Sequence, residues 1–213
     1  MSMTSGLIAI KGEHLDKLPE ILAFYQMVDT KENQSVDDWR EALAIVTDLQ
    51  APAPGDTSEK HVVWSDKGWT LIEDMTLIMC ANEKALSEIS RHLSTPVLSL
   101  VTQGTSNCFG FWYFDNIKRR SFYIEDRAIV DNFGEPLPEE AGFNFNEDAF
   151  YHDVHGVAKA FGVDWEGAGT LYAFTVKRLD YKEEVRQGML AAIAKHAAAK
   201  AEEKKKPWWK IWT

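Results

Sequence analysis

Three side chains in the last third of the chain have the types and spacing of metal ligands. Asp148, His152 and His155 are separated by four and three residues, so on a helix they would share one face. Carboxylate and imidazole groups are common ligands of zinc. Solvent-facing helix positions show the same spacing without any metal, and a zinc site also needs partners that fix its ligands. We therefore predict no metal site and keep these three residues as the alternative.

The chain carries none of the sequence motifs that usually mark a catalytic site. It has no Gly-x-Ser-x-Gly elbow, no Gly-x-Gly-x-x-Gly turn, no Walker loop and no His-Glu-x-x-His helix. Adjacent acids such as Glu73 and Asp74 could exchange protons, but general acid catalysis needs a desolvated carboxyl group, and acids near turns are usually solvated. We predict no catalytic residue, no cofactor and no enzymatic activity. A metal-dependent enzyme built on the three residues above is one alternative.

Charge indicates the kind of partner. The formal net charge is −10, and because the last ten residues contain four lysines and no acid, the remainder carries −14. Nucleic-acid binding requires a basic stripe that releases counterions from phosphate, whereas the positive charges here are scattered among more numerous acids. The basic cluster Lys118 to Arg120 follows a hairpin turn, where charges commonly protect an edge strand. We predict a basic protein partner and no nucleic acid.

The C-terminal residues combine tryptophan with lysine. Trp208, Trp209 and Trp212 stand among four lysines, at 204–206 and 210. This composition is typical of segments at a membrane interface or in an aromatic pocket. The rings could equally fold back onto an apolar patch of the same molecule. Both readings stay open, and we include the three tryptophans among the predicted partner-binding residues, with a membrane surface as a second contact.

Cysteine usage and hydropathy indicate the compartment. Cys80 and Cys108 are too few for a disulfide scaffold or a four-thiolate metal site, so both are expected to be buried free thiols. The chain begins without a signal-peptide pattern, and no apolar run approaches the roughly 20 residues that span a bilayer. We expect a cytoplasmic protein.

Hydrophobic spacing predicts alternating helices and strands. Helices are expected over 19–28, 36–48, 83–93 with Asn82 as cap, 147–161 with Asn146 as cap, and 181–206. The second helix is expected to start from a capping box of Ser35 and Asp38. Strands are expected as two hairpins, 61–64 with 69–72 and 109–114 with 117–124, and over 97–101, 128–130 and 171–176.

These elements predict an α+β fold. We expect a largely antiparallel sheet of about five to seven strands, built from hairpins and packed against helices. The expected domains are a helical N-terminal segment over 1–50, an α+β core over 60–180, a long projecting C-terminal helix over 181–206 and a Trp-rich tail over 207–213. The Pro- and Gly-rich stretch 50–59 separates the first two.

From Trp69 to about Gly162, the chain resembles a loosely defined group of bacterial proteins in the order of several short motifs. They are Gly-Trp-Thr-Leu-Ile at 68–72, Leu93-Ser94 before a strand, the aromatic hairpin, and Gly-Glu-Pro-Leu-Pro-Glu-Glu at 134–140. They are similar to uncharacterised α/β immunity-type proteins encoded near polymorphic or contact-dependent toxins, over less than half of the chain. The resemblance implies an acidic protein that docks on a basic toxin and blocks its active surface.

The sequence therefore predicts a non-enzymatic immunity protein that neutralises a toxin through an acidic surface. Glu135, Glu139 and Glu140, in the loop that follows the aromatic hairpin, are the expected docking acids. The alternative is a scaffold or accessory protein that its Lys/Trp-rich tail anchors to a membrane or a larger complex.

Overall fold

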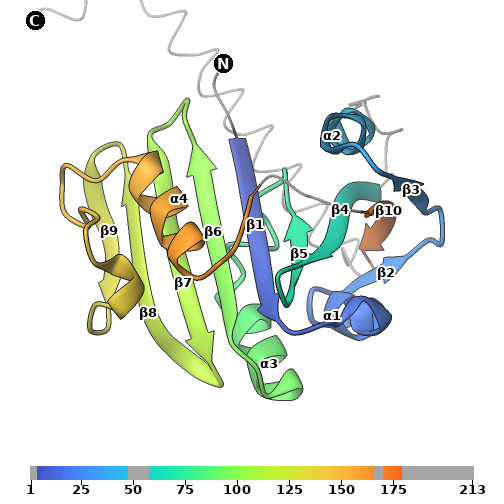
Figure 1. Cartoon of the computed structure of the whole chain (residues 1–213), viewed down its shortest axis with the longest axis horizontal. Coiled ribbons are helices and arrows are strands. Elements are labelled where there is room, and N and C mark those ends of the chain that lie inside the picture. The colour runs from blue at the N-terminus through green and yellow to red at the C-terminus, as the bar shows by residue number, and fades with distance from the viewer. Residues whose placement is uncertain (1–3, 48–57, 166–169, 179–213) are drawn as a thin grey trace, which may run out of the picture. The chain divides into compact units, whose positions relative to one another are not determined.

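Ten antiparallel strands form one sheet in the computed structural model, which describes residues 4–47, 58–165 and 170–178 (Figure 1). The strand order is β2-β10-β4-β5-β1-β6-β7-β8-β9, and β3 also pairs with β10. The strands are β1 (Thr4–Lys11), β2 (Met27–Asp29), β3 (Gln34–Val36), β4 (Ser58–Asp66), β5 (Trp69–Glu73), β6 (Val97–Gln103), β7 (Cys108–Asp115), β8 (Ile117–Glu125), β9 (Ala128–Phe133) and β10 (Leu171–Arg178). The helices are α1 (Leu18–Phe24), α2 (Trp39–Thr47), α3 (Glu83–Leu93) and α4 (Tyr151–Ala160), with short 3-10 helices η1 (Leu15–Lys17) and η2 (Pro138–Glu140).

The first strand, β1, lies in the middle of the sheet. It pairs with β5 on one side and with β6 on the other. Its residues from Ser5 to Ile10 are all buried, because side chains on both of its faces are covered. A strand covered on both faces is a continuous run of apolar or small residues, without the alternation of a half-exposed strand.

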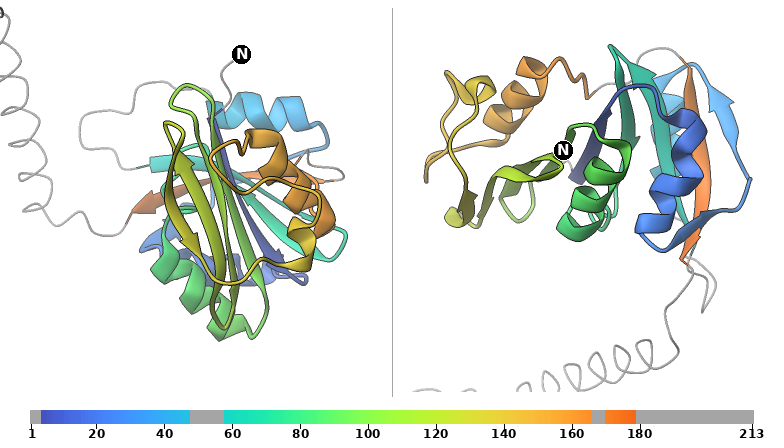
Figure 2. Two further views of the ribbon diagram at one scale, coloured as in Figure 1. Left: turned by 90° about the vertical axis from the view of Figure 1, so that its left-hand side faces the viewer. Right: turned by 90° about the horizontal axis from the view of Figure 1, so that it is seen from below.

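Two helices cover each face of the sheet (Figure 2). Ala42 and Val46 of α2 and Val154 and Ala158 of α4 pack in one core, together with Leu7 of β1. The other core contains the apolar residues of α1 and α3 and the opposite face of β1, and its helical members are Leu18, Ile21, Leu22, Ala85, Leu86 and Ile89. Burial of these two apolar layers is the main stabilising term of the fold.

The predicted fold class is wrong in its strand count and in its N-terminal segment. The described residues form ten strands, against the five to seven expected. The sequence predicts a helical segment over 1–50, yet this segment supplies β1, β2 and β3 as well as α1 and α2. β1 has no period of two, and β2 and β3 have three residues each, too short for a periodic signal. The predicted helix over 181–206 and the tail over 207–213 lie outside the described residues.

Both predicted hairpins are confirmed. β4 and β5 pair around Lys67 and Gly68, whose φ angles of 48° and 75° suit a short hairpin turn. The aromatic strands β7 and β8 pair as expected. The start of α3 is also confirmed, since the side chain of Asn82 accepts a hydrogen bond from the N–H of Ala85 at 3.1 Å.

The capping box predicted for α2 is wrong. Ser35 lies in β3, and the carboxylate of Asp38 accepts a hydrogen bond from the N–H of Glu41 at 2.9 Å. Asp38 therefore caps the helix by itself. The observed cap, Asp38, lies three residues after the predicted one, Ser35. Serine and aspartate side chains can both accept a hydrogen bond from a backbone N–H two or three positions further on, so the sequence does not distinguish them.

The turn between β8 and β9 places two non-glycine residues at positive φ, 47° at Asp126 and 66° at Arg127. Since glycine adopts this conformation without a Cβ clash, Arg127→Gly is expected to raise the free energy of unfolding by about 0.5–1 kcal/mol in urea denaturation. Arg119→Gly, at an exposed position within β8, is the control and is expected to lower it by a similar amount. A lower stability of Arg127→Gly would contradict a strained turn.

Candidate functional site

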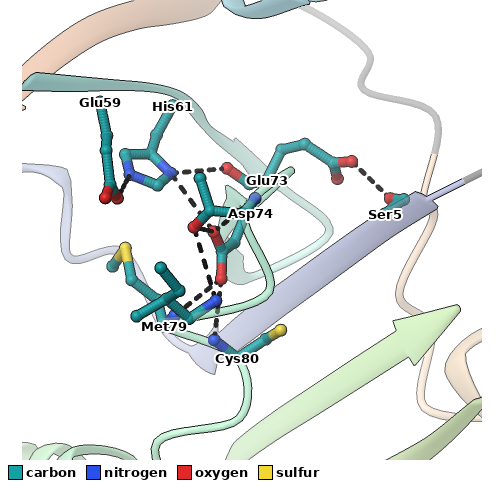
Figure 3. A network of polar contacts seen from close by, with 9 residues as sticks. Ser5, Glu59, His61, Glu73, Asp74, Met79 and Cys80 are labelled. Carbon is teal, nitrogen blue, oxygen red and sulfur yellow. Dashed lines mark hydrogen bonds and ion pairs between the residues drawn. The ribbon is translucent and has the colours of Figure 1, made fainter. Parts of the chain in front are cut away.

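Asp74 is the centre of a buried hydrogen-bond network between β5 and α3 (Figure 3). Its Oδ2 accepts hydrogen bonds from the N–H groups of Met79 and Cys80, at 2.7 and 3.0 Å, and its Oδ1 accepts one from the hydroxyl of Thr76 at 2.6 Å. The residue has no exposed surface. A buried carboxylate needs such donors to offset its desolvation, so Asp74 fixes the loop that joins β5 to α3.

His61 of β4 lies beside Asp74 and is also fully buried. Its Nδ1 is 3.2 Å from the backbone oxygen of Glu73 and 3.9 Å from Oδ1 of Asp74. Its Nε2 is 3.6 Å from Oε2 of Glu59 (Figure 3). The imidazole therefore connects β4 to the end of β5 within a layer that is otherwise apolar.

Glu73 points to the opposite face of the sheet from Asp74, because successive side chains of a strand alternate (Figure 3). Its carboxyl group accepts hydrogen bonds from the hydroxyl of Ser5 and, at 3.2 Å, from the indole N–H of Trp165. Burial raises the pKa of Glu73 to about 8, although the two donors lower it in part. Glu73 is therefore largely protonated at neutral pH.

The expectation that adjacent acids are solvated is wrong for Glu73 and Asp74. One feature of the sequence indicates that Glu73 is buried. It is the last residue of a strand with an apolar sequence, and all five residues of that strand are buried. Neither cleft described below is lined by these acids or by His61. Burial also raises the pKa of the Cys80 thiol, which keeps it protonated and a poor nucleophile. We assign this network to the stability of the fold.

Cys80 and Cys108 are buried free thiols, as predicted. Cys80 packs in the core that contains α1 and α3, and Cys108, the first residue of β7, is 4% exposed. Among the described residues, no group of three His, Cys, Asp or Glu side chains is placed to hold a metal ion.

The predicted start of α4 is wrong, and this separates the three candidate metal ligands. The carboxylate of Asp153 accepts a hydrogen bond from the N–H of Phe150 at 2.8 Å, and the helix begins at Tyr151. Asn146 is therefore not the cap, and Asp148 lies ahead of the helix. The acids near 147 predict an earlier helix start, but the capping carboxylate is that of Asp153 in the first turn, which accepts a hydrogen bond from the N–H of the preceding Phe150.

The two histidines of the trio have different surroundings. His152 is exposed. His155 is partly buried, and its ring stacks on that of Trp165 with centroids 4.5 Å apart. Burial, followed by the nearby Lys159, lowers the pKa of His155. A stacked, partly buried imidazole is explained by packing alone.

The loop predicted to dock on a partner holds one of its acids in the interior. Glu140 is 6% exposed, and its two oxygens accept hydrogen bonds from Nε and Nη2 of Arg120 at 2.8 and 2.9 Å. Nη1 of Arg120 donates to Oδ1 of Asn132 at 2.7 Å. Glu140 therefore stabilises the fold through a bidentate ion pair. Glu135 is exposed and Glu139 is partly exposed, and both remain predicted docking residues.

A cleft of about 470 Å³ lies beside this ion pair. Its lining residues are Arg120, Asn132, Gly134, Pro136, Glu140, Phe143 and Phe145. The charged and amide side chains that line this cleft form hydrogen bonds with one another. A ligand would have to compete with these hydrogen bonds. This arrangement favours a structural role for the cleft.

A second cleft, which we call the α4 cleft, has a volume of about 230 Å³ and an apolar floor. The floor is formed by Phe109, Ile124 and Ala149, each at most 7% exposed. The half-exposed ring of Phe150 forms a wall and lies 6.0 Å from that of Phe109, centroid to centroid. The polar lining residues are Asn107, Arg127, Glu147 and Asp148.

Exposed acids and aromatic rings meet at the N-terminal end of α4, beside this cleft. We call Glu147, Asp148, Phe150 and Tyr151 the α4 docking face. Phe150 and Tyr151 are 49% and 50% exposed, and their ring centroids are 5.3 Å apart. The carboxylates of Glu147 and Asp148 make no hydrogen bond or ion pair within the described residues. In this it differs from the first cleft, whose charged groups pair with one another.

The remaining predicted contacts, Trp208, Trp209 and Trp212, lie outside the described residues. In the part of the chain that is described, no helix is both long enough and apolar enough to cross a membrane. The sequence predicts docking at the loop 135–140, and at 147–151 the structure brings exposed rings together with acids that have no partner among the described residues. Comparison of the chain with protein-family models, with curated proteins and with solved structures finds no match.

Proposed function

We propose that the chain is a non-enzymatic binding protein that neutralises a basic bacterial toxin by docking on it. The observation that carries the proposal is the α4 docking face, where two carboxylates without a partner among the described residues adjoin two half-exposed aromatic rings. Aromatic residues are enriched at the centres of protein interfaces, and carboxylates select basic partners. The resemblance from Trp69 to about Gly162 supports a toxin as that partner, and a cytoplasmic location is part of the proposal.

The charge of the whole chain supports the same class of partner. A net charge of −10 attracts a basic protein over distances beyond direct contact and raises the association rate. Glu135 and Glu139 extend the acidic surface around the loop before α4 and contribute to this attraction. Contacts at the α4 docking face then slow dissociation.

Co-purification tests the proposal directly. We expect the tagged full-length chain, recovered from its native cells, to elute with one basic protein at stoichiometric yield, identified by mass spectrometry. Recovery with membranes or a multi-protein assembly, lost on deletion of residues 204–213, would instead support the scaffold alternative. Elution of the chain by itself would contradict both.

Charge reversal at the α4 docking face is expected to weaken that complex. Glu147→Lys with Asp148→Lys should raise the Kd of the co-purified partner by about 10- to 100-fold, since both changes create like-charge contacts. Glu13→Lys with Asp16→Lys changes the net charge equally at exposed acids near α1, and should alter the Kd by less than about threefold at physiological salt. Equal losses for the two pairs, measured by calorimetry, would show that only net charge matters.

A further inference from the structure

We infer that the α4 cleft is a pocket for an arginine side chain of the partner protein. The inference rests on the proposed function for the source of that arginine, but the pocket itself can be tested without the partner. It assigns one occupant to the floor of Phe109 and Ile124, the wall of Phe150, and the acids Glu147 and Asp148.

The apolar floor fits the stem of a long basic side chain. Phe109 and Ile124 come from neighbouring strands and are directly paired in the sheet, so the floor belongs to the rigid core. Arginine carries three methylene groups before its charged end, and such stems commonly lie on apolar surface while the head stays near water. A short polar or acidic side chain would leave this floor uncovered.

The wall and the acids fit the guanidinium group. Its flat face stacks on aromatic rings, and the half-exposed ring of Phe150 forms the wall of the cleft. Its N–H groups pair with carboxylates in a fork, and those of Glu147 and Asp148 have no other partner within the described segments. Lysine could reach the same acids, but its compact ammonium group would stack less well.

Arg127 also lines the α4 cleft and opposes this occupant. Its charge is outweighed by the two acids, so the lining carries a net charge of −1. An acidic ligand held by Arg127 would have to lie against Glu147 and Asp148, whose charges are not neutralised by any described residue. The charge balance therefore favours a cationic side chain.

The test uses the isotope-labelled full-length chain and N-acetyl-arginine amide as probe, followed by NMR. We expect saturable shifts centred on Phe109, Ile124 and Phe150, at probe concentrations in the millimolar range. N-acetyl-citrulline amide has nearly the same shape without the charge, and should bind at least tenfold more weakly. Equal binding of citrulline, preferential binding of N-acetyl-glutamate amide, or shifts scattered over all acidic surfaces would overturn the inference.

Matched variants separate the pocket from general acidity. Glu147→Gln with Asp148→Asn should weaken arginine binding at least tenfold, whereas Glu125→Gln with Asp126→Asn removes two nearby acids that do not line the cleft and should change it by less than twofold. Phe150→Leu should weaken binding several-fold, and Tyr172→Leu, at an exposed ring of β10, should not.

The outcomes also distinguish this inference from the proposed function. A basic partner that binds while the arginine probe does not would leave the proposed function intact and remove the pocket. Arginine binding without any basic partner from native cells would keep the pocket and remove the toxin-neutralising role.

Discussion

Glu73→Gln is expected to remove most of the loss of stability that the native chain undergoes between about pH 4.5 and about pH 8. The folded state holds the pKa of Glu73 at about 8, against 4.5 for a solvated glutamate, mainly because burial disfavours the charge. The glutamine side chain has nearly the same shape and stays neutral. The variant and the native chain should therefore be almost equally stable near pH 4.5 and differ most above pH 8.

Proton linkage explains why the stability of the native chain falls as the pH rises. Below about pH 4.5 the Glu73 carboxyl is protonated in both the folded and the unfolded chain, so it contributes no pH dependence. As the pH rises to about 8, the unfolded chain releases this proton and the folded chain retains it, so stability falls. Since one pKa unit corresponds to about 1.4 kcal/mol, the loss amounts to at most about 4–5 kcal/mol.

Urea denaturation measures the free energy of unfolding of both proteins across this pH range. Other titrating groups contribute equally to the two proteins, so the difference between the two free energies reports Glu73 alone. Glu125→Gln, at an exposed position of β8, is the control and should follow the native profile. Parallel curves for Glu73→Gln and the native chain would show that the buried carboxyl titrates normally.

Glu140→Gln is expected to destabilise the chain by about 3–5 kcal/mol, which is the usual effect of leaving a buried charge without its partner. Arg120 is 2% exposed, and four of its five N–H groups are oriented by Glu140, Asn132 and backbone oxygens. Glutamine would retain one acceptor oxygen but lose the negative charge. The effect should appear as a lower urea midpoint at neutral pH.

Two further variants test whether the unpaired charge of Arg120 causes the loss of stability. Glu139→Gln changes the neighbouring, partly exposed acid and should alter stability by less than about 0.5 kcal/mol. The double change Arg120→Met with Glu140→Leu removes both charges and should recover much of the loss, because hydrophobic pairs often replace buried ion pairs well. A double variant as unstable as Glu140→Gln would show that the hydrogen bonds of Arg120, and not its charge, are what the fold requires.

This buried ion pair also changes how the motif at 134–140 is understood. The sequence predicts that its acids form an exposed docking surface, but Glu140 faces inward and joins η2 to β8 through Arg120. The motif therefore fixes the position of η2, which follows β9, against β8. The α4 docking face lies further along the chain, at 147–151.

The elements that could be predicted from sequence were those built from local interactions. Each confirmed hairpin joins strands that are adjacent in sequence, with turn residues whose positive φ can be anticipated from glycine or asparagine nearby. The cap of α3 by Asn82 involves an amide three residues away. Such signals need no knowledge of the rest of the chain.

Long-range pairing decided what could not be predicted. β10 pairs with β2, β3 and β4, from which it is separated by more than 100 residues, and β1 pairs with β5 and β6. No local pattern specifies such partners. Because β1 lies between two apolar cores, its sequence is a short apolar stretch without the alternation of a half-exposed strand, and the prediction of a helical N-terminal segment misses it.

The sequence alone determined the acidic character of the protein, its aromatic hairpin and the burial of both thiols, because charge, local pairing and apolar content are properties of composition and of neighbouring residues. Only the tertiary structure decided which acids face solvent. Glu73, Asp74 and Glu140 are buried against donors from β1, the β5–α3 loop and β8, whereas Glu147 and Asp148, beside Phe150, have no partner in the segments that the structure describes. A carboxylate's role depends on donors brought to it by distant strands, and that information arises only when the sheet is assembled.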